Sequence, residues 1–453
     1  MQGRFRIVAA LALRWALALA SAPSFAQPML PLETFYALLN TNEAAAQASL
    51  KRISQGWRNE YAAPLLEIVG FVHSRATQLG IVSALEKASG RALGGSLDLW
   101  YEWLWSMEPG THPDYAEFKA GLYEQIDPRF REYFEGRPKT LIRLDEIRWG
   151  GVHRDGIPPL KNPKMIRGRD ATYLADDNIV FGVAIEGDVR AYPQRILAWH
   201  EMVKDTIAGR PLNGVYCTLC GAMILYDVTV NGVHHELGTS GFLYRSNKLM
   251  YDHATKSLWS TLTGTPVVGP LAGKGIELKT LHVVTTTWKE WRKRHPETQV
   301  LSLDTGHQRD YSEGAAYREY FATDRLMFGV PKLDSRLPNK AEVLALRFPG
   351  TDEQLAIAAD FLRANRVYHD RIGRQAFVVL TDASGANRVY DSGSVRFESW
   401  EGESLAREHS GRKWKVAEDR LTGPGGETLR RLAAHRAFWF GWYAAYPNTR
   451  LVR

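Results

Sequence analysis

Two stretches of this chain resemble each other, and an internal repeat constrains its fold more than any other feature of the sequence. Residues 214–227 align without a gap with residues 378–391, and one glycine, one tyrosine and one aspartate recur in register. Further matches follow with small changes of spacing: Trp259, Gly269-Pro270, Trp288, Trp291 and Pro296-Glu-Thr298 with Trp414, Gly423-Pro424, Trp439, Trp442 and Pro447-Asn-Thr449. The chain is therefore expected to contain two copies of one unit.

Short runs of β-branched and aromatic residues predict that this unit is rich in strands. In the first copy these runs cover residues 179–185, 215–217, 222–230, 233–237 and 249–251. Asn231-Gly232 lies between two of them and predicts a two-residue hairpin turn, because both central residues of that turn need positive φ. A short helix is expected from Gln194 to about His200.

The region before the repeats has a different pattern. From Leu32 to Phe134, apolar residues recur three and four positions apart, which indicates helices. Prolines then interrupt this pattern, and residues 144–159 predict a long shaped loop. The sequence thus predicts an α+β fold with a signal peptide at 1–26, a helical N-terminal region at 27–140, a first β-rich repeat at 141–305 and a second, degenerate repeat at 306–453.

The first residues have the order of a secretory signal. Arg4 and Arg6 precede an apolar run over residues 7–20, and Ser24 and Ala26 provide the small residues of a cleavage site. The run is shorter than the roughly 20 residues that a membrane span needs. We expect an exported protein, periplasmic in a bacterium with two membranes, with no transmembrane span in the mature chain.

Composition narrows the function classes. Hydrophobic residues make up 45% and charged residues 24%, which is typical of a globular chain. The whole chain has a net charge of +7, which becomes smaller when the arginines of the predicted signal are removed. The positive residues are too dispersed to indicate nucleic-acid binding. The chain is rich in tryptophan, with 14 residues, which indicates core packing or, alternatively, stacking against a ligand.

The two cysteines of the chain, Cys217 and Cys220, form one CxxC in the first copy. The second copy has Thr381 and Ser384 at these positions. If the unit needed the cysteines in order to fold, a copy that lacks both would be hard to explain. The pair is therefore expected to have a role of its own in the first copy.

Three interpretations of the pair remain open. Two thiolates on a turn shaped by Gly221 suit a soft metal ion such as copper, zinc or iron, completed by a further ligand. A redox dithiol usually begins a helix, where the dipole stabilises the thiolate, whereas a strand is predicted here. The third interpretation is a structural disulfide that closes a short loop.

His200 is the candidate third metal ligand, since it precedes the CxxC closely and is followed by the acids Glu201 and Asp205. Nearby side chains are candidates for the surrounding shell or for a pocket: Ser240, Tyr244, Asn247, Met250, Tyr251, Asp252 and His253. No serine-hydrolase elbow, phosphate loop or dinucleotide fingerprint is present. The sequence names no catalytic residue.

Several motifs in fixed order resemble a family of bacterial and archaeal proteins known as domain of unknown function 3179. They are Arg190-Ala-Tyr-Pro193, Trp199-His-Glu-Met202 with Asp205, Tyr216-Cys-Thr-Leu-Cys-Gly221, Ser240-Gly-Phe-Leu-Tyr244, Leu249-Met-Tyr-Asp252, Ser257-Leu-Trp-Ser260 and His295-Pro296. The resemblance covers residues 144–346, with a fainter copy beyond. It implies that His200, Glu201, Asp205, the two cysteines and residues 244–252 belong to one pattern, but it brings no established reaction. Family members commonly have asparagine at Lys204 and proline at Thr218.

The leading hypothesis is a soft-metal site formed by Cys217, Cys220 and His200. The expected partner of the protein is a metal donor or an unknown small molecule. A ligand-binding module with a structural disulfide is the first alternative. A thiol-disulfide oxidoreductase is the second. Whether the protein is an enzyme is left open.

Overall fold

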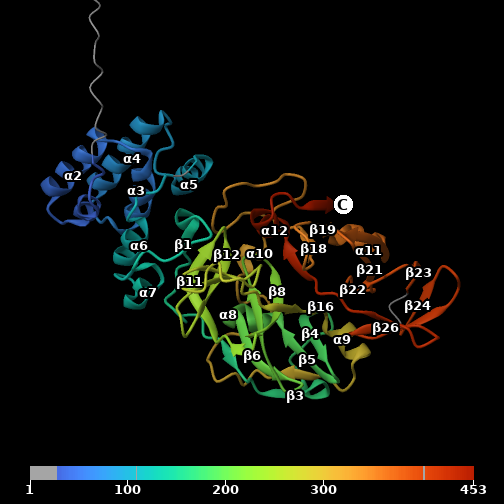
Figure 1. The fold of residues 1–453 in the computed structure, drawn as a ribbon. Helices are drawn as coiled ribbons and strands as arrows, with labels where there is room; N and C mark the ends of the chain where they lie inside the picture. Colours follow the sequence, from blue (N-terminus) through green and yellow to red (C-terminus); the bar gives the residue numbers. More distant parts are fainter. Residues whose placement is uncertain (1–27, 109, 401–403) are drawn as a thin grey trace, which may run out of the picture.

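A computed structural model describes residues 28–108, 110–400 and 404–453 (Figure 1). The predicted signal peptide, residues 1–26, lies outside the described residues. Within the described part, no helix is both long enough and apolar enough to span a bilayer. Helices and strands both contribute to the fold, which is α+β.

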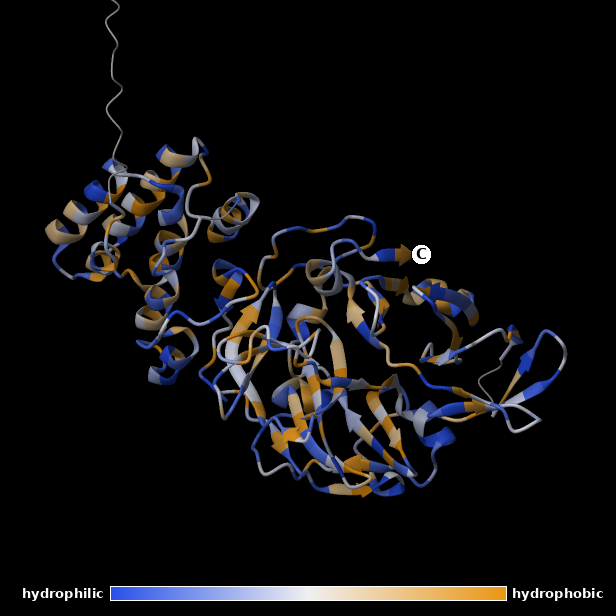
Figure 2. Cartoon of the chain, viewed as in Figure 1, coloured by the Kyte–Doolittle hydropathy of each residue, from blue (hydrophilic) through white to orange (hydrophobic). Residues whose placement is uncertain are grey.

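Helices occupy the chain from Leu32 to Phe134 and form a lobe at one end of the molecule (Figure 1). Most of their apolar faces meet in one core, which includes Phe35, Leu65, Trp100 and Phe118, while hydrophilic residues dominate several outer turns (Figure 2). Tyr133 and Phe134 of the last helix pack in another core, with Phe242 and Tyr251. The helices are α1 (Leu32–Tyr36), α2 (Glu43–Gln55), α3 (Ala62–Ile68), α4 (Arg75–Ser89), α5 (Leu97–Ser106), α6 (Tyr115–Tyr123) and α7 (Arg131–Phe134).

Three five-stranded sheets follow in the first β-rich unit. The first has the order β16 (Val284–Thr287), β4 (Ile179–Ile185), β5 (Asp188–Pro193), β17 (Gln299–Leu301) and β3 (Met165–Arg167). The second has the order β15 (Lys279–Leu281), β8 (Ala222–Asp227), β7 (Arg210–Cys217), β6 (Met202–Ile207) and β2 (Leu160–Lys161). The third has the order β1 (Ile147–Trp149), β11 (Leu237–Tyr244), β12 (Asn247–Asp252), β13 (Leu258–Ser260) and β14 (Pro266–Val268). Helices α8 (Gln194–His200) and α9 (Trp288–Arg294) complete this unit.

Local predictions in this unit had mixed outcomes. The Asn231-Gly232 hairpin is confirmed: β9 (Thr229–Val230) and β10 (Val233–His234) pair across it, and both turn residues have positive φ. The strand predicted over 222–230 is interrupted, because the Asp227 carboxylate accepts a hydrogen bond from the Thr229 amide at 3.1 Å. The predicted loop at 144–159 contains strand β1, which pairs with β11.

The second β-rich unit has a four-stranded, a three-stranded and a five-stranded sheet. The first has the order β28 (His435–Phe438), β18 (Glu342–Arg347), β19 (Gln354–Ala358) and β29 (Arg450–Val452). The second has the order β20 (Val367–Ile372), β21 (Gln375–Thr381) and β22 (Asn387–Asp391). The third contains β23 (Phe397–Ser399), β24 (Leu405–Glu408), β25 (Lys413–Val416), β26 (Arg420–Thr422) and β27 (Thr428–Arg430). Its helices are α11 (Ala359–Ala364) and α12 (Trp439–Ala445), and α10 (Arg318–Phe321) lies between the units along the chain.

The two units share their connectivity. The order β4, β5, α8, β6, β7, β8 in the first corresponds to β18, β19, α11, β20, β21, β22 in the second. The last strand returns in parallel to its neighbour in both, β17 beside β5 and β29 beside β19. The indole of Trp291 donates to the Thr298 hydroxyl at 3.0 Å, and that of Trp442 donates to Thr449 at the same distance.

Each unit places the junction before its last helix against the β-turn of the other. The Phe438 amide, at the end of β28, donates to the Cys220 carbonyl at 2.7 Å. Reciprocally, the Thr286 hydroxyl of β16 lies 3.2 Å from the Ser384 hydroxyl. The CxxC turn therefore lies inside the molecule, at the contact between the two units.

Candidate functional site: a buried dithiol turn

The CxxC forms the tight turn between β7 and β8, whose last residue pair is Cys217 with Ala222. The Cys220 amide donates to the Cys217 carbonyl at 3.1 Å, and Gly221 has a φ of 59°. A Cβ at Gly221 would lie 2.9 Å from the ring of Phe438. Both the positive φ and the close approach require glycine here.

Both thiols are free and almost completely buried, with exposed fractions of 2% for Cys217 and 0% for Cys220. The Cys220 sulfur lies 2.8 Å from Asn247 Oδ1 and 3.4 Å from the Ser246 carbonyl. Asn247 begins β12, so the neighbouring sheet supplies this contact. The site is thus a vicinal dithiol in a dry interior, with polar partners from another sheet.

The two thiols differ in acidity. Burial would raise the pKa of Cys217, but the Cys220 thiol and the backbone N–H of Lys248 hold that pKa below its usual value. Burial raises the pKa of Cys220 well above its usual value, and the neighbouring Cys217 adds to this effect. Cys217 is therefore the more readily ionised sulfur of the pair.

Helix α12 of the second unit covers the dithiol. A Cβ at Gly441 would lie 3.2 Å from Cβ and 3.6 Å from Sγ of Cys220. Asn247 Nδ2 donates to the Gly441 carbonyl at 3.3 Å, which connects the cover to the side chain that contacts Cys220. The second unit thus completes the site although it contributes no thiol.

A buried ion pair adjoins the turn. Lys248 Nζ lies 3.1 Å from Glu201 Oε2, and both residues are buried. Glu201 Oε1 accepts hydrogen bonds from the Thr218 hydroxyl at 2.9 Å and the Tyr317 hydroxyl at 3.2 Å. Thr218 lies between the two cysteines, so the ion pair is directly connected to the CxxC.

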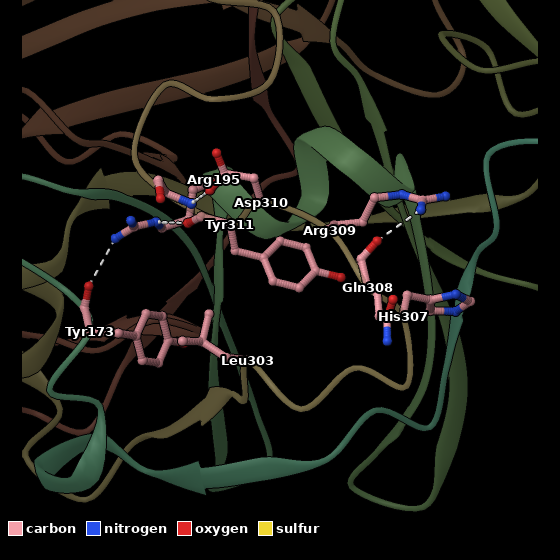
Figure 3. A pocket seen from close by; sticks show the side chains of 9 residues that line it. Tyr173, Arg195, Leu303, His307, Gln308, Arg309, Asp310 and Tyr311 are labelled. Carbon is pink, nitrogen blue, oxygen red and sulfur yellow. Dashed lines mark hydrogen bonds between the residues drawn. The ribbon is translucent and has the colours of Figure 1, made fainter.

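His200 has different partners. Its Nδ1 donates to the Pro158 carbonyl at 2.8 Å, so Nε2 of the neutral ring accepts from the Tyr311 hydroxyl at 2.6 Å. Burial lowers the pKa of His200 to about 4, which keeps the ring neutral. Tyr311 also lines a cavity of about 770 Å³ with His307 and Arg309 (Figure 3).

The structure does not gather His200 and the two thiols into one set of ligands. Within the described ranges, no three or more His, Cys, Asp or Glu side chains are grouped so that they could hold a metal ion. Both ring nitrogens of His200 are engaged elsewhere. The dithiol has Asn247 and the Lys248 backbone as its closest polar neighbours instead.

Of the other predicted residues, Glu201 and Asn247 lie at the dithiol. Asp205 accepts from Arg190 at 2.7 Å and from the Tyr192 hydroxyl at 2.6 Å, which is a structural role. The remaining predicted side chains have other partners or positions: Ser240 bonds the Leu249 carbonyl, Tyr251 bonds Asp155, Asp252 bonds His235 and the turn at residues 254–255, Met250 is buried in the core, Tyr244 lies beside Arg245, and His253 stacks on Tyr251.

Sequence reasoning missed Lys248, Tyr317 and Gly441. Lys248 lies directly between the family motifs at residues 240–244 and 249–252, so its position in the pattern was a usable signal. Tyr317 comes from the segment between the two units, and Gly441 comes from the second unit. Neither has a local signal, because only the packing of the two units brings them to the turn.

Comparison with known proteins gives one match. No curated protein matches the chain, and no solved structure does. Residues 154–449, which cover most of both β-rich units, match the family described as "Protein of unknown function (DUF3179)". The chain therefore belongs to the DUF3179 family.

Proposed function

We propose that this protein is exported and binds one soft metal ion, Cu(I), through Cys217 and Cys220. The observation that supports this proposal is the pair of free, buried thiols on one tight turn, where the Cys220 thiol interacts with Cys217. Thiolates are the protein ligands that soft ions prefer. The turn shaped by Gly221 keeps both thiols in one buried interior.

The ligand set favours copper over zinc and iron. A structural zinc site needs four ligands, and iron also takes more than two. The described residues offer no third His, Cys, Asp or Glu in reach of such a group. Cu(I) accepts two thiolates alone, so His200 is not needed and is left out of the proposed ligands. The Lys248 backbone N–H, which lowers the pKa of Cys217, favours the ionised sulfur that a metal requires.

We further propose that the two units arose by duplication and that the second serves as a cover. The shared connectivity and the matching Trp–Thr hydrogen bonds support this origin. The contacts of Phe438 and Gly441 with Cys220 support the covering role. In this proposal the first unit provides the ligands and the second excludes water from them.

The test is the metal content of full-length protein, isolated anaerobically from the exported fraction, beside single variants. We expect about one copper per chain, lost in Cys217→Ser and Cys220→Ser and retained in His200→Ala. Ser384→Ala, at the matching position of the second copy, is the control and should also retain copper. Loss of metal in His200→Ala would overturn the two-thiol ligand set. Metal-free protein with an oxidised, unreactive pair would overturn the metal site and favour a structural disulfide.

A dithiol redox couple is the second candidate. The observation that favours it is the unequal acidity of the pair, with a lowered pKa at Cys217 and a raised one at Cys220. The more acidic sulfur would attack, and its neighbour would resolve the mixed disulfide. A redox titration of metal-free protein distinguishes the candidates, since a couple should cycle fully with glutathione, whereas a buried ligand pair should react slowly.

A further inference from the structure

A second cavity lies between the two β-rich units, and neither cysteine lines it. Its volume is about 540 Å³, within the range of small-molecule sites. The first unit lines it with Ile224 of β8 and Lys279 of β15, among others. The second unit contributes Ala345 and Arg347 of β18, His435 of β28 and Trp442 of α12. A ligand here would contact both units at once.

The charged groups around this cavity are mostly positive. Lys279, Arg347, Arg430 and Arg431 line it, and Glu277 is the one acid among its lining residues. Glu277 is paired with Arg347 at 2.5 Å. The interaction with Glu277 and the nearby tyrosines raises the pKa of Arg347 despite its burial, so the guanidinium stays charged. Arg431 is paired with Glu418 at 3.1 Å, and Arg430 Nε lies 3.9 Å from Asp391. One more cation than acid therefore remains around the cavity, which favours an anionic ligand.

Two lining residues have buried nitrogen atoms without a hydrogen-bond partner among the described residues, Nε2 of His435 and Nε of Arg431. Buried polar atoms are rarely left unsatisfied, because the loss of hydrogen bonding to water is costly. Burial, together with Arg347, lowers the pKa of His435 to about 4. His435 is therefore a neutral imidazole at neutral pH, and its nitrogen is suited to a hydrogen bond with a ligand.

Most of the other lining residues are apolar, with Thr280 and Gln375 as the polar exceptions. Leu262, Phe348 and Trp442 contribute large hydrophobic side chains, and Ala433 and Ala434 leave space between them. His435 lies edge-to-face with Trp442, at a ring distance of 5.8 Å. A ligand that fills this space needs an apolar, preferably aromatic body as well as its charge.

We infer that this cavity binds an organic carboxylate with an aromatic body. The carboxylate meets the cationic side formed by Arg347 and Arg430, and the aromatic body packs against Trp442 and Phe348. This site is independent of the metal proposal, since it uses neither cysteine.

Calorimetric titration with 1-naphthoate tests the inference, with 1-naphthalenemethanol as an uncharged probe of similar shape. We expect naphthoate to bind at least tenfold more tightly than the alcohol. Arg347→Met should weaken naphthoate binding about tenfold, and Arg430→Gln, whose side chain is 72% exposed, should weaken it about threefold with no risk to folding. Lys289→Gln, a cation 71% exposed outside the cavity, is the matched control and should leave binding unchanged.

Hydrogen exchange locates the bound probe, because naphthoate should slow amide exchange in β28 at His435–Phe438. A Cys217→Ser/Cys220→Ser variant should bind naphthoate as the parent does, so failure of the metal site would not affect this result. Equal affinity for acid and alcohol would overturn the inference. Unchanged affinity in both arginine variants, or protection elsewhere than β28, would overturn it as well.

Discussion

The turns at residues 217–221 and 381–385, which lie at corresponding places in the connectivity of the two β-rich units, are stabilised in different ways. In the second, the Asp382 carboxylate accepts hydrogen bonds from the Ser384 amide at 3.0 Å, the Ser384 hydroxyl at 2.6 Å and the Ala386 amide at 3.0 Å. Arg388 Nη1 also donates to Asp382, at 2.8 Å. In the first turn Thr218 takes the place of Asp382, and its hydroxyl bonds Glu201 instead.

The difference indicates how two units of shared connectivity can have turns with different roles. The second turn is supported by its own buried network, which continues from Arg388 to Glu418 at 2.9 Å and from Glu418 to Arg431 at 3.1 Å. The first turn has no acid within it, and its thiols contact groups on other elements. Its side chains are thus available for a ligand, whereas those of the second are committed to the fold.

The largest expected effect comes from Asp382→Ala. It removes a partner from Arg388, whose side chain is 1% exposed, and removes the side-chain acceptor of the Ser384 amide. We expect a loss of about 3 to 5 kcal/mol in the free energy of unfolding, measured with urea. Thr218→Ala, the matching change in the first turn, should cost only about 1 to 2 kcal/mol, because Glu201 keeps Tyr317 and Lys248 as partners. Equal losses of unfolding free energy in Asp382→Ala and Thr218→Ala would contradict the difference described between the two turns.

Replacement of the two turn glycines should have a smaller but unequal effect. Both have positive φ, 59° at Gly221 and 85° at Gly385, so alanine strains both by about 1 to 2 kcal/mol. Gly221→Ala also meets the ring of Phe438 at 2.9 Å, which adds about 1 to 3 kcal/mol of overpacking. At Gly385 the nearest atom is the flexible Arg363 Nε at 3.1 Å, which can move away. Thermal unfolding of both variants checks this order, and a more harmful Gly385→Ala would reverse it.

The second turn's network should also make the protein sensitive to acid. Despite burial, the charges of Arg388 and Arg431 and the contact with His295 hold the pKa of Glu418 well below its usual 4.5. This lowered pKa means that ionised Glu418 stabilises the fold above pH 4.5, and that this contribution is lost as the pH falls through the folded-state pKa. Glu418→Gln should lower stability at pH 7 and flatten its decline below pH 4.5, as urea unfolding at a series of pH values would record. An unchanged acid decline would show that other groups control it.

The smallest effect on stability is expected for Cys220→Ser. Serine can keep the hydrogen bond to Asn247 Oδ1, now 2.8 Å from the sulfur, so the loss should be within about 1 kcal/mol. Metal binding should nevertheless disappear. A loss of several kcal/mol by urea unfolding would instead indicate that the thiol is needed for the fold.

Local and repeating patterns predicted much of the fold. The strand at residues 179–185, the Asn231-Gly232 hairpin and the helix ending at His200 are set by short-range rules, and each is present. Trp291 and Trp442 matched in the sequence and have matching roles in the structure. These features depend on neighbouring residues or on a pattern that recurs along the chain, and a single sequence displays both.

The site was less predictable, because tertiary contacts decide it. His200 is close to the CxxC in sequence. At the end of α8, however, its ring forms hydrogen bonds with Pro158 and Tyr311 instead. Lys248 and Asn247 lie near the turn because their sheet packs beside the sheet that holds the CxxC. Gly441 is brought there by the packing of the second unit. No local pattern contains the packing between the two units, so the residues that cover the dithiol could not be inferred.

X-ray absorption at the copper edge, on full-length protein loaded anaerobically with one equivalent of Cu(I), tests the central claim most directly. The account predicts a low-coordinate Cu(I) ion with two sulfur ligands and no imidazole scattering, unchanged in His200→Ala and abolished in Cys217→Ser. A spectrum with a histidine ligand, or copper that remains bound when Cys217 is replaced, would contradict it.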